Sequence, residues 1–214
     1  AASVYYPSPF EESAILVVDA MSEFECTTFY YAKGNHIKRL LKYNFPHSLG
    51  FLYATMTDYL GFKSNNDEYK VMGLASYGKP AYYDKLKSVI NINPNGEIKI
   101  NYGFFSKHFR GREYFNEKFI SEFGQKRLPG EEINEKHINM ASSIQKILEE
   151  SVMKMLIHLK KMTGSKNICL SGGVALNCKM NGKILKDGPF ENIFLQPAPH
   201  DAGCSIGSAL LVKH

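Results

Sequence analysis

The ten residues 168–177, I-C-L-S-G-G-V-A-L-N, decide the fold class of this chain. The apolar run at 168–170 is typical of a buried strand, and the small apolar residues after the glycines are typical of a helix that follows it. Two adjacent glycines predict a tight strand-to-helix turn, and because glycine has no Cβ, they let the backbone come close to a ligand. The stretch therefore predicts a strand–turn–helix unit of an α/β protein.

Residues 134–214 extend this alternation on both sides of the glycines. Apolar residues at steps of three and four from Ala141 to Met162 predict a long helix, which Thr163 and Gly164 end. The elements expected in order are helix 134–162, strand 167–171, helix 178–186, strand 192–196 and helix 202–212. Such alternation predicts a sheet with parallel strands joined by helical crossovers, so we interpret 134–214 as a single helix–strand–helix–strand–helix lobe.

The first sixty residues are expected to add strands to that sheet. The run A-I-L-V-V-D at 14–19 predicts a buried strand that ends in a carboxylate, and 27–31 predicts its hairpin partner. Residues 37–43 fit a third strand or a short helix, and both options stay open. A helix is expected over 48–60, with Ser48 as its N-cap and Gly61 at its end.

The middle of the chain predicts smaller elements. Short helices are expected over 70–75 and 82–90, and N-P-N-G at 93–96 predicts a hairpin turn. Residues 104–132 are aromatic and charged without clear periodicity, and we expect them on the surface. We interpret 93–132 as a peripheral hairpin and insertion within one domain, because no linker divides the chain.

Composition excludes several classes of protein. The net charge is +5, but the lysines are scattered, so no nucleic-acid partner is expected. No apolar run approaches the length of about 20 residues that a membrane span needs, and no signal peptide is visible. The four cysteines form no C-x-x-C pair, which favours reduced, mostly buried thiols in a cytoplasmic protein. The chain does not begin with Met, so we expect a fragment.

The glycine turn permits a nucleotide or phosphate ligand. The helix after it would offer free N–H groups and the positive end of its dipole. The spacing is neither G-x-G-x-x-G nor a P-loop, so a plain turn without ligand is an equal alternative. Ser171 as a nucleophile is disfavoured, because the G-x-S-x-G elbow and a histidine partner are lacking.

Charged residues elsewhere admit two interpretations each. Asp201, in Q-P-A-P-H-D-A-G at 196–203, is either a metal ligand at the carboxyl edge of the sheet or a plain N-cap. His200 is interpreted as a surface or supporting histidine, because adjacent residues rarely bind one ion. Glu68 and Lys70 suit ribose and phosphate, or an exposed ion pair. Asp19 is a phosphate-side or metal-side group, or an ordinary turn residue.

Five segments taken together resemble the O-carbamoyltransferases, the family of nodulation-factor and antibiotic-tailoring enzymes. The resemblance runs from Ala1 to Leu211, and its most specific parts are E-Y-K-V-M-G-L-A and S-G-G-V-A-L-N-C. The segments are Y-P-S-P-F-E-E-S-A-I-L-V-V-D from Tyr6, S-L-G-F-L-Y from Ser48, E-Y-K-V-M-G-L-A-S-Y-G from Glu68, S-G-G-V-A-L-N-C-K-M-N-G from Ser171, and Q-P-A-P-H-D-A-G from Gln196.

This resemblance implies a fold and a reaction. The fold would be the actin/hexokinase/Hsp70-like (ribonuclease H-like) ATPase fold, present here as an incomplete carbamoyl-transfer domain over 1–214. A separate C-terminal domain would make carbamoyl-adenylate from carbamoyl phosphate and ATP. The transfer domain would then pass the carbamoyl group to a hydroxyl of a small-molecule acceptor. A divalent metal, iron in this type of site, would be held by two histidines and an aspartate.

The resemblance implies roles for individual residues of this chain. Asp201 matches the metal-binding aspartate. The nucleotide residues implied by the resemblance are Gly172, Gly173 and Asn177 on the adenosine side, Glu68 on the ribose side, and Lys70 and Asp19 on the phosphate side.

Departures from the family pattern limit the expected activity. The two metal histidines and the acceptor-activating residues would lie before Ala1, and the adenylate-forming domain would follow His214. Ala20, Ser22, Asp67 and His200 stand where glycine is common in the family. We therefore expect weak nucleotide binding and no turnover from this chain alone. A non-catalytic nucleotide- or partner-binding module, and an ATPase or sugar kinase of the same fold, are the alternatives.

Overall fold

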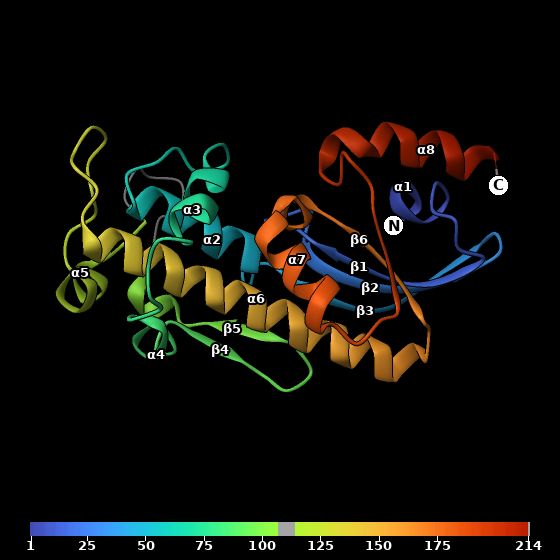
Figure 1. Cartoon of the computed structure of the whole chain (residues 1–214), viewed down its shortest axis with the longest axis horizontal. Helices are drawn as coiled ribbons and strands as arrows, with labels where there is room; N and C mark the ends of the chain where they lie inside the picture. The colour runs from blue at the N-terminus through green and yellow to red at the C-terminus, as the bar shows by residue number, and fades with distance from the viewer. Residues whose placement is uncertain (107–113, 214) are drawn as a thin grey trace. The chain divides into compact units, whose positions relative to one another are not determined.

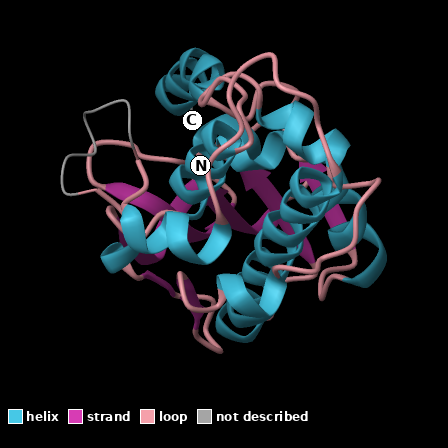
Figure 2. Ribbon diagram, turned by 90° about the vertical axis from the view of Figure 1, so that its left-hand side faces the viewer, coloured by secondary structure: helices cyan, strands magenta, loops and turns pink. Residues whose placement is uncertain are grey.

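The computed structural model describes residues 1–106 and 114–213. Its strands are β1 (Glu12–Val18), β2 (Glu25–Lys33), β3 (His36–Asn44), β4 (Ile90–Ile92), β5 (Ile98–Ile100), β6 (Asn167–Ser171) and β7 (Asn192–Leu195). Its α-helices are α1 (Ala2–Tyr5), α2 (Leu49–Tyr59), α3 (Glu68–Leu74), α4 (Tyr83–Leu86), α5 (Glu117–Phe123), α6 (Glu135–Thr163), α7 (Cys178–Asp187) and α8 (Cys204–Lys213). Short 3-10 helices are η1 (Tyr102–Phe104), η2 (Gly173–Leu176) and η3 (Asp201–Gly203). Figure 2 shows the strands in magenta among the helices in cyan.

The chain forms two compact units made of discontinuous segments. Unit 1 comprises Ala1–Phe51, Asn93–Glu97 and Glu149–His214, and unit 2 comprises Leu52–Ile92 and Ile98–Leu148. The chain passes from one unit to the other inside α2 and α6 and at the two ends of the turn between β4 and β5.

A five-stranded sheet organises unit 1. Its strand order is β3-β2-β1-β6-β7, with β1, β2 and β3 antiparallel and β1, β6 and β7 parallel. Three antiparallel strands followed by parallel crossover strands in this order are the arrangement of the ribonuclease H-like fold. The predicted α/β class is therefore confirmed, and residues 37–43 form a strand rather than a helix.

Apolar side chains alternate between the two faces of the sheet. On one face, α1 packs with Val4 and Tyr5 against Ile15, Ala32 and Cys169. Helix α8 lies beside α1 on this side, as Figure 1 shows. On the opposite face Phe29 of β2 meets His158 of α6, with ring centroids 6.4 Å apart. Helices thus cover both faces, and only the ends of the strands are left for loops that can carry function.

Three parallel strands place their carboxyl ends at one edge of the sheet. Leu16 of β1 pairs with Leu170 of β6, which pairs with Leu195 of β7. Asp19, just after β1, and Ser171, the last residue of β6, therefore come to the same edge. We call this the carboxyl edge; ligands of open α/β sheets bind in this place.

Unit 2 has a core of aromatic rings. Phe104, Phe105, Phe115, Phe119 and Phe123 are all at most 8% exposed. The ring centroids of Phe115 and Phe119, for example, are 4.3 Å apart. The expectation that 104–132 lies on the surface is therefore wrong for these residues, which form a core without a regular period. The part of the segment at 107–113 lies outside the described residues.

Local predictions for the smaller elements were mostly confirmed. Ser48 accepts a hydrogen bond from the Phe51 N–H at 3.1 Å, as an N-cap does. The helix expected over 82–90 is limited to α4, and its end becomes β4 of a two-stranded hairpin with β5. All four cysteines are free, but Cys178 and Cys204 are exposed, so the prediction of mostly buried thiols is wrong for half of them. Among the described residues, the helices are too short or too polar to cross a membrane.

Candidate functional site

Gly172 turns the chain sharply where β6 ends. Its φ is +89°, which L side chains rarely adopt, and a Cβ would overlap the carbonyl of Val18 in β1. Its N–H donates to the Pro199 carbonyl at 2.7 Å. The first glycine is therefore required by close packing between three stretches of the chain, which the sequence analysis did not foresee.

Gly173 has a different neighbour. A Cβ built there would lie 3.2 Å from Oδ1 of Asp19, and its φ lies outside the left-handed region. The structure thus brings together the second glycine and Asp19, two residues that are 154 positions apart in the sequence. Bare backbone faces a carboxylate here, at the edge where the sequence predicted a nucleotide.

Asp19 is held by main-chain contacts. Its N–H donates to Cys26 and its Oδ1 accepts from the Ala20 N–H at 2.7 Å. A Cβ at Gly50 of α2 would come within 2.7 Å of the Asp19 carbonyl. The family pattern has glycine at position 20, and the alanine there put close approach in doubt. Gly50 nevertheless approaches the Asp19–Ala20 backbone closely.

The loop from Gln196 to Gly203 closes the carboxyl edge after β7. The Pro199 carbonyl accepts from Gly172 and from Oγ of Ser171, the latter at 3.0 Å. Ser171 is only 6% exposed, and its hydroxyl is engaged in this bond. Its arrangement is that of a structural hydroxyl rather than of a nucleophile.

Asp201 and His200 stand at the start of η3. Both are exposed, and Nδ1 of His200 accepts from the Ala202 N–H at 3.3 Å. His200 is therefore the N-cap of η3, and it supports the loop. Asp201 follows as the acidic residue of the first turn.

These residues do not make a metal site by themselves. Within residues 1–106 and 114–213, no three histidine, cysteine, aspartate or glutamate side chains gather closely enough to hold an ion. Transition-metal sites take three or more protein ligands. The part of the chain described here therefore does not fit the implied iron, and Asp201 would be one ligand of a set completed from elsewhere.

Asn177 begins α7. Its Oδ1 accepts from the Met180 N–H at 2.9 Å, and the residue is 9% exposed. The predicted adenosine-side residue is thus an N-cap whose carbonyl oxygen is used inside the protein. It holds α7 behind the glycine turn.

Gln196 is a polar residue of the edge that sequence reasoning did not assign. It follows β7, is 6% exposed, and its Oε1 has no hydrogen-bond partner among the described residues. A buried amide oxygen without a donor is costly, so this side chain marks the edge as a place where a water or ligand donor would be favourable. The available signal was a polar residue at the last position of the strand predicted over 192–196.

Glu68 and Lys70 belong to unit 2 and are described within it. Glu68 accepts from the Asn65 N–H at 2.6 Å. Lys70 pairs with Asp67 at 3.0 Å, not with Glu68. The Lys63 N–H and the Lys70 ammonium lower the pKa of the Asp67 carboxyl, and Asp67 in turn raises the pKa of Lys70. Each predicted residue is thus engaged in a local contact.

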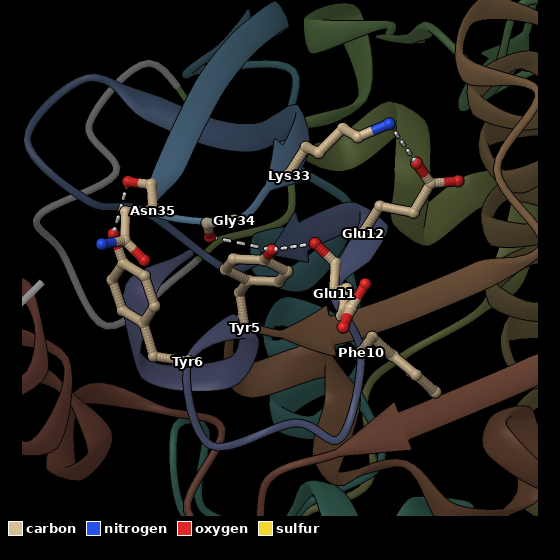
Figure 3. A pocket seen from close by; sticks show the side chains of 8 residues that line it. All are labelled: Tyr5, Tyr6, Phe10, Glu11, Glu12, Lys33, Gly34 and Asn35. Carbon is tan, nitrogen blue, oxygen red and sulfur yellow. Dashed lines mark hydrogen bonds and ion pairs between the residues drawn. The ribbon is translucent and has the colours of Figure 1, made fainter.

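A pocket of about 590 Å³ lies in unit 1 where β1 begins, at the opposite end from the carboxyl edge. Figure 3 shows its lining: the Tyr5 hydroxyl donates to the Glu11 and Gly34 carbonyls, and Lys33 pairs with Glu12. The Tyr6 hydroxyl donates to the Asn35 carbonyl, and the pocket lining contains none of the predicted site residues.

Comparison with known proteins agrees with this description. Residues 1–210 match the family described as carbamoyltransferase N-terminus. An uncharacterized protein of Synechocystis sp., sll1178, is 41% identical over 100% of this chain and 35% of its own length. The nodulation protein NolNO of Sinorhizobium fredii is 36% identical over 99% of this chain and 30% of its own. The chain thus spans about a third of the length of these relatives.

One solved structure, HypF of T. kodakarensis, aligns over 98% of this chain and 35% of its own at 16% identity. Its TM-score is 0.42, which is too low to support an argument. The family match covers nearly the whole sequence, so the chain belongs to the carbamoyltransferase N-terminus family.

Proposed function

We propose that this chain is part of an O-carbamoyltransferase and forms the nucleotide-facing edge of its transfer domain. Membership of the carbamoyltransferase N-terminus family supports the reaction class. The observation that carries the site is the bare backbone of Gly173, held next to the Asp19 carboxylate at the carboxyl edge. Free thiols at all four cysteines are consistent with a cytoplasmic protein, which we also propose.

The proposed reaction is transfer of a carbamoyl group from carbamoyl-adenylate, made from carbamoyl phosphate and ATP, to a hydroxyl of a small-molecule acceptor. The acceptor oxygen attacks the carbamoyl carbon, a new C–O bond forms, and the bond from that carbon to the adenylate phosphate oxygen breaks. AMP leaves with the electron pair, and the hydroxyl proton passes to a base supplied outside this chain. Within the chain, Gly172 and Gly173 would receive the adenylate, with Asn177 fixing α7 behind them.

The remaining predicted residues have smaller parts in this proposal. Asp19 would lie on the phosphate side, and Glu68 and Lys70 would serve ribose and phosphate only after leaving their present partners. Asp201 would contribute one ligand to a divalent metal, which the family resemblance implies is iron, and no step above runs through it.

A calorimetric titration of ATP into the 214-residue chain tests the nucleotide site. We expect weak binding that falls about tenfold or more in Gly173→Val, because the new side chain would enter the space beside Asp19. Gly182→Val is the matched control: Gly182 lies in α7 and nothing stands within 4 Å of its Cβ position. Equal ATP affinity in the parent and in Gly173→Val would contradict the proposed site.

Further arms separate the reaction classes. Because Asp201 is the sole expected metal ligand on this chain, ferrous iron or manganese should change the ATP affinity less than twofold. The effect of metal on ATP affinity should be equally small in Asp201→Ala. The chain alone should not turn over carbamoyl phosphate with ATP. Hydrolysis of ATP without carbamoyl phosphate would favour an ATPase or kinase, and ATP binding without turnover in a longer protein would favour a non-catalytic module.

A further inference from the structure

One carbonyl connects the two loops of the carboxyl edge. The Pro199 oxygen accepts two hydrogen bonds, from Oγ of Ser171 at 3.0 Å and from the N–H of Gly172 at 2.7 Å. Both donors belong to the strand-to-helix turn, and the acceptor belongs to the loop that carries Asp201. Of these three groups, only the Ser171 hydroxyl belongs to a side chain. Its hydrogen bond can therefore be removed by substitution.

The connection lies in a closely packed region. Gly172 has no room for a Cβ because of Val18, and Gly203 has none because of the Ala198 carbonyl. Ser171 is 6% exposed, so water does not compete freely for its hydroxyl. A hydrogen bond in such surroundings contributes more to holding two segments in register than an exposed one does.

We propose that Ser171 is a positioning residue that holds the glycine turn in the conformation that receives the nucleotide. This role rests on the proposed function and deepens it. The hydroxyl does not touch the ligand; it acts through the Pro199 carbonyl on Gly172 and, one residue further, on Gly173. Removing it leaves one donor on that carbonyl and lets the turn and the loop separate more often.

Ser165 is the matched comparison near the other end of the same strand. It precedes β6, whereas Ser171 ends it, and its Oγ also donates to a backbone carbonyl, that of Asn167, at 3.0 Å. It is 2% exposed. Its Oγ also accepts from the Asn167 N–H at 3.1 Å, so Ser165→Ala removes two similarly buried hydrogen bonds at the start of β6, far from the turn.

Amide hydrogen exchange of the 214-residue chain without ligand tests the connection. We expect the Gly172 N–H to exchange roughly five- to tenfold faster in Ser171→Ala, which corresponds to the loss of one buried hydrogen bond. Ser171→Thr, which keeps the hydroxyl, should restore the parent rate, and Ser165→Ala should leave it unchanged. An unchanged Gly172 rate in Ser171→Ala would overturn the connection, as would equal acceleration in Ser165→Ala.

ATP titration of the same variants tests the positioning. Ser171→Ala should bind ATP roughly five- to tenfold more weakly, while Ser171→Thr and Ser165→Ala should stay within about twofold of the parent. Parent-like ATP affinity in Ser171→Ala would overturn the positioning role alone. Absence of ATP binding in the parent chain would overturn the proposed nucleotide site, and the role of Ser171 with it, whatever the exchange rates show.

Discussion

The carboxyl edge of unit 1 and the loop at 63–70 of unit 2 were both predicted to bind a nucleotide, and they are built differently. At the edge, main-chain groups from distant stretches pack on one another, and glycines make the contact possible. In the loop, charged side chains bind neighbours only a few residues away: Asp67 with Lys63 and Lys70, and Glu68 with Asn65.

This difference shows why residue type alone is a poor guide to a site. A carboxylate or ammonium is available to a ligand only where the protein does not already use it. Backbone at a glycine is available to a ligand only where no neighbour fills the space of the missing side chain, and at Gly172 Val18 fills it. Substitutions in each unit test this difference.

The largest expected effect is at Gly172. Gly172→Ala places a Cβ against the Val18 carbonyl at a φ of +89°, so we expect the free energy of unfolding to fall by roughly 3 kcal/mol or more. Denaturant titration measures it. Gly182→Ala in α7 is the control, which should gain up to about 1 kcal/mol from helix propensity. Similar stability in the two variants would show that main-chain packing does not build the edge.

The corresponding substitution in unit 2 is Arg127→Ala. Arg127 is 6% exposed and donates to the carbonyls of Leu60, Gly61 and Glu131. Its loss should lower the free energy of unfolding by roughly 2–3 kcal/mol, because these carbonyls lose a charged donor. Arg127→Lys should recover only part of it, since an ammonium lacks the planar fork. If either variant had the same free energy of unfolding as the parent, side chains would not be what holds the loops of this unit.

Lys70→Met measures how far the loop serves a nucleotide. Lys70 must leave Asp67 before it can reach a phosphate, so we expect ATP affinity to fall only about two- to fivefold. ATP titrations of Lys70→Met and Gly173→Val, done side by side, show which substitution weakens binding more. A larger loss in Lys70→Met than in Gly173→Val would reverse the comparison between the two regions.

A smaller effect is expected from pH. The pKa of Asp67 is lowered in the folded chain by the Lys63 N–H and by Lys70. Its contribution to stability is therefore present above the unfolded carboxyl pKa of about 3.9 and is lost as pH falls through the lower, folded value. Urea midpoints from pH 6 to pH 3 should fall less in Asp67→Asn than in the parent. Parallel profiles would exclude this contribution.

Regular patterns made much of the fold predictable. The alternation after residue 134, the strand at 14–19 and the Ser48 N-cap depend on neighbours along the chain, and each was confirmed. The phenylalanines of 104–123 were placed on the surface because they show no period, yet they meet as rings from η1, α5 and the chain between them. Irregular segments form cores that no period reveals.

The sequence predicted which residues lie at the site, but it did not predict why each of them is needed there. The glycine pair was read as space for a ligand, whereas Gly172 is required by Val18 and only Gly173 faces Asp19. The Pro199 carbonyl gave no sequence signal of its role, because that role depends on a contact between segments far apart in the chain.

The most direct test of the central claim is to map ATP onto the chain by amide chemical shifts. We expect ATP to shift the Gly172 and Gly173 resonances most, followed by Asp19 and the loop at 199–203, and we expect Gly173→Val to remove these shifts. Saturating ATP that leaves Gly172 and Gly173 unmoved, while resonances elsewhere shift, would contradict a nucleotide site at the carboxyl edge.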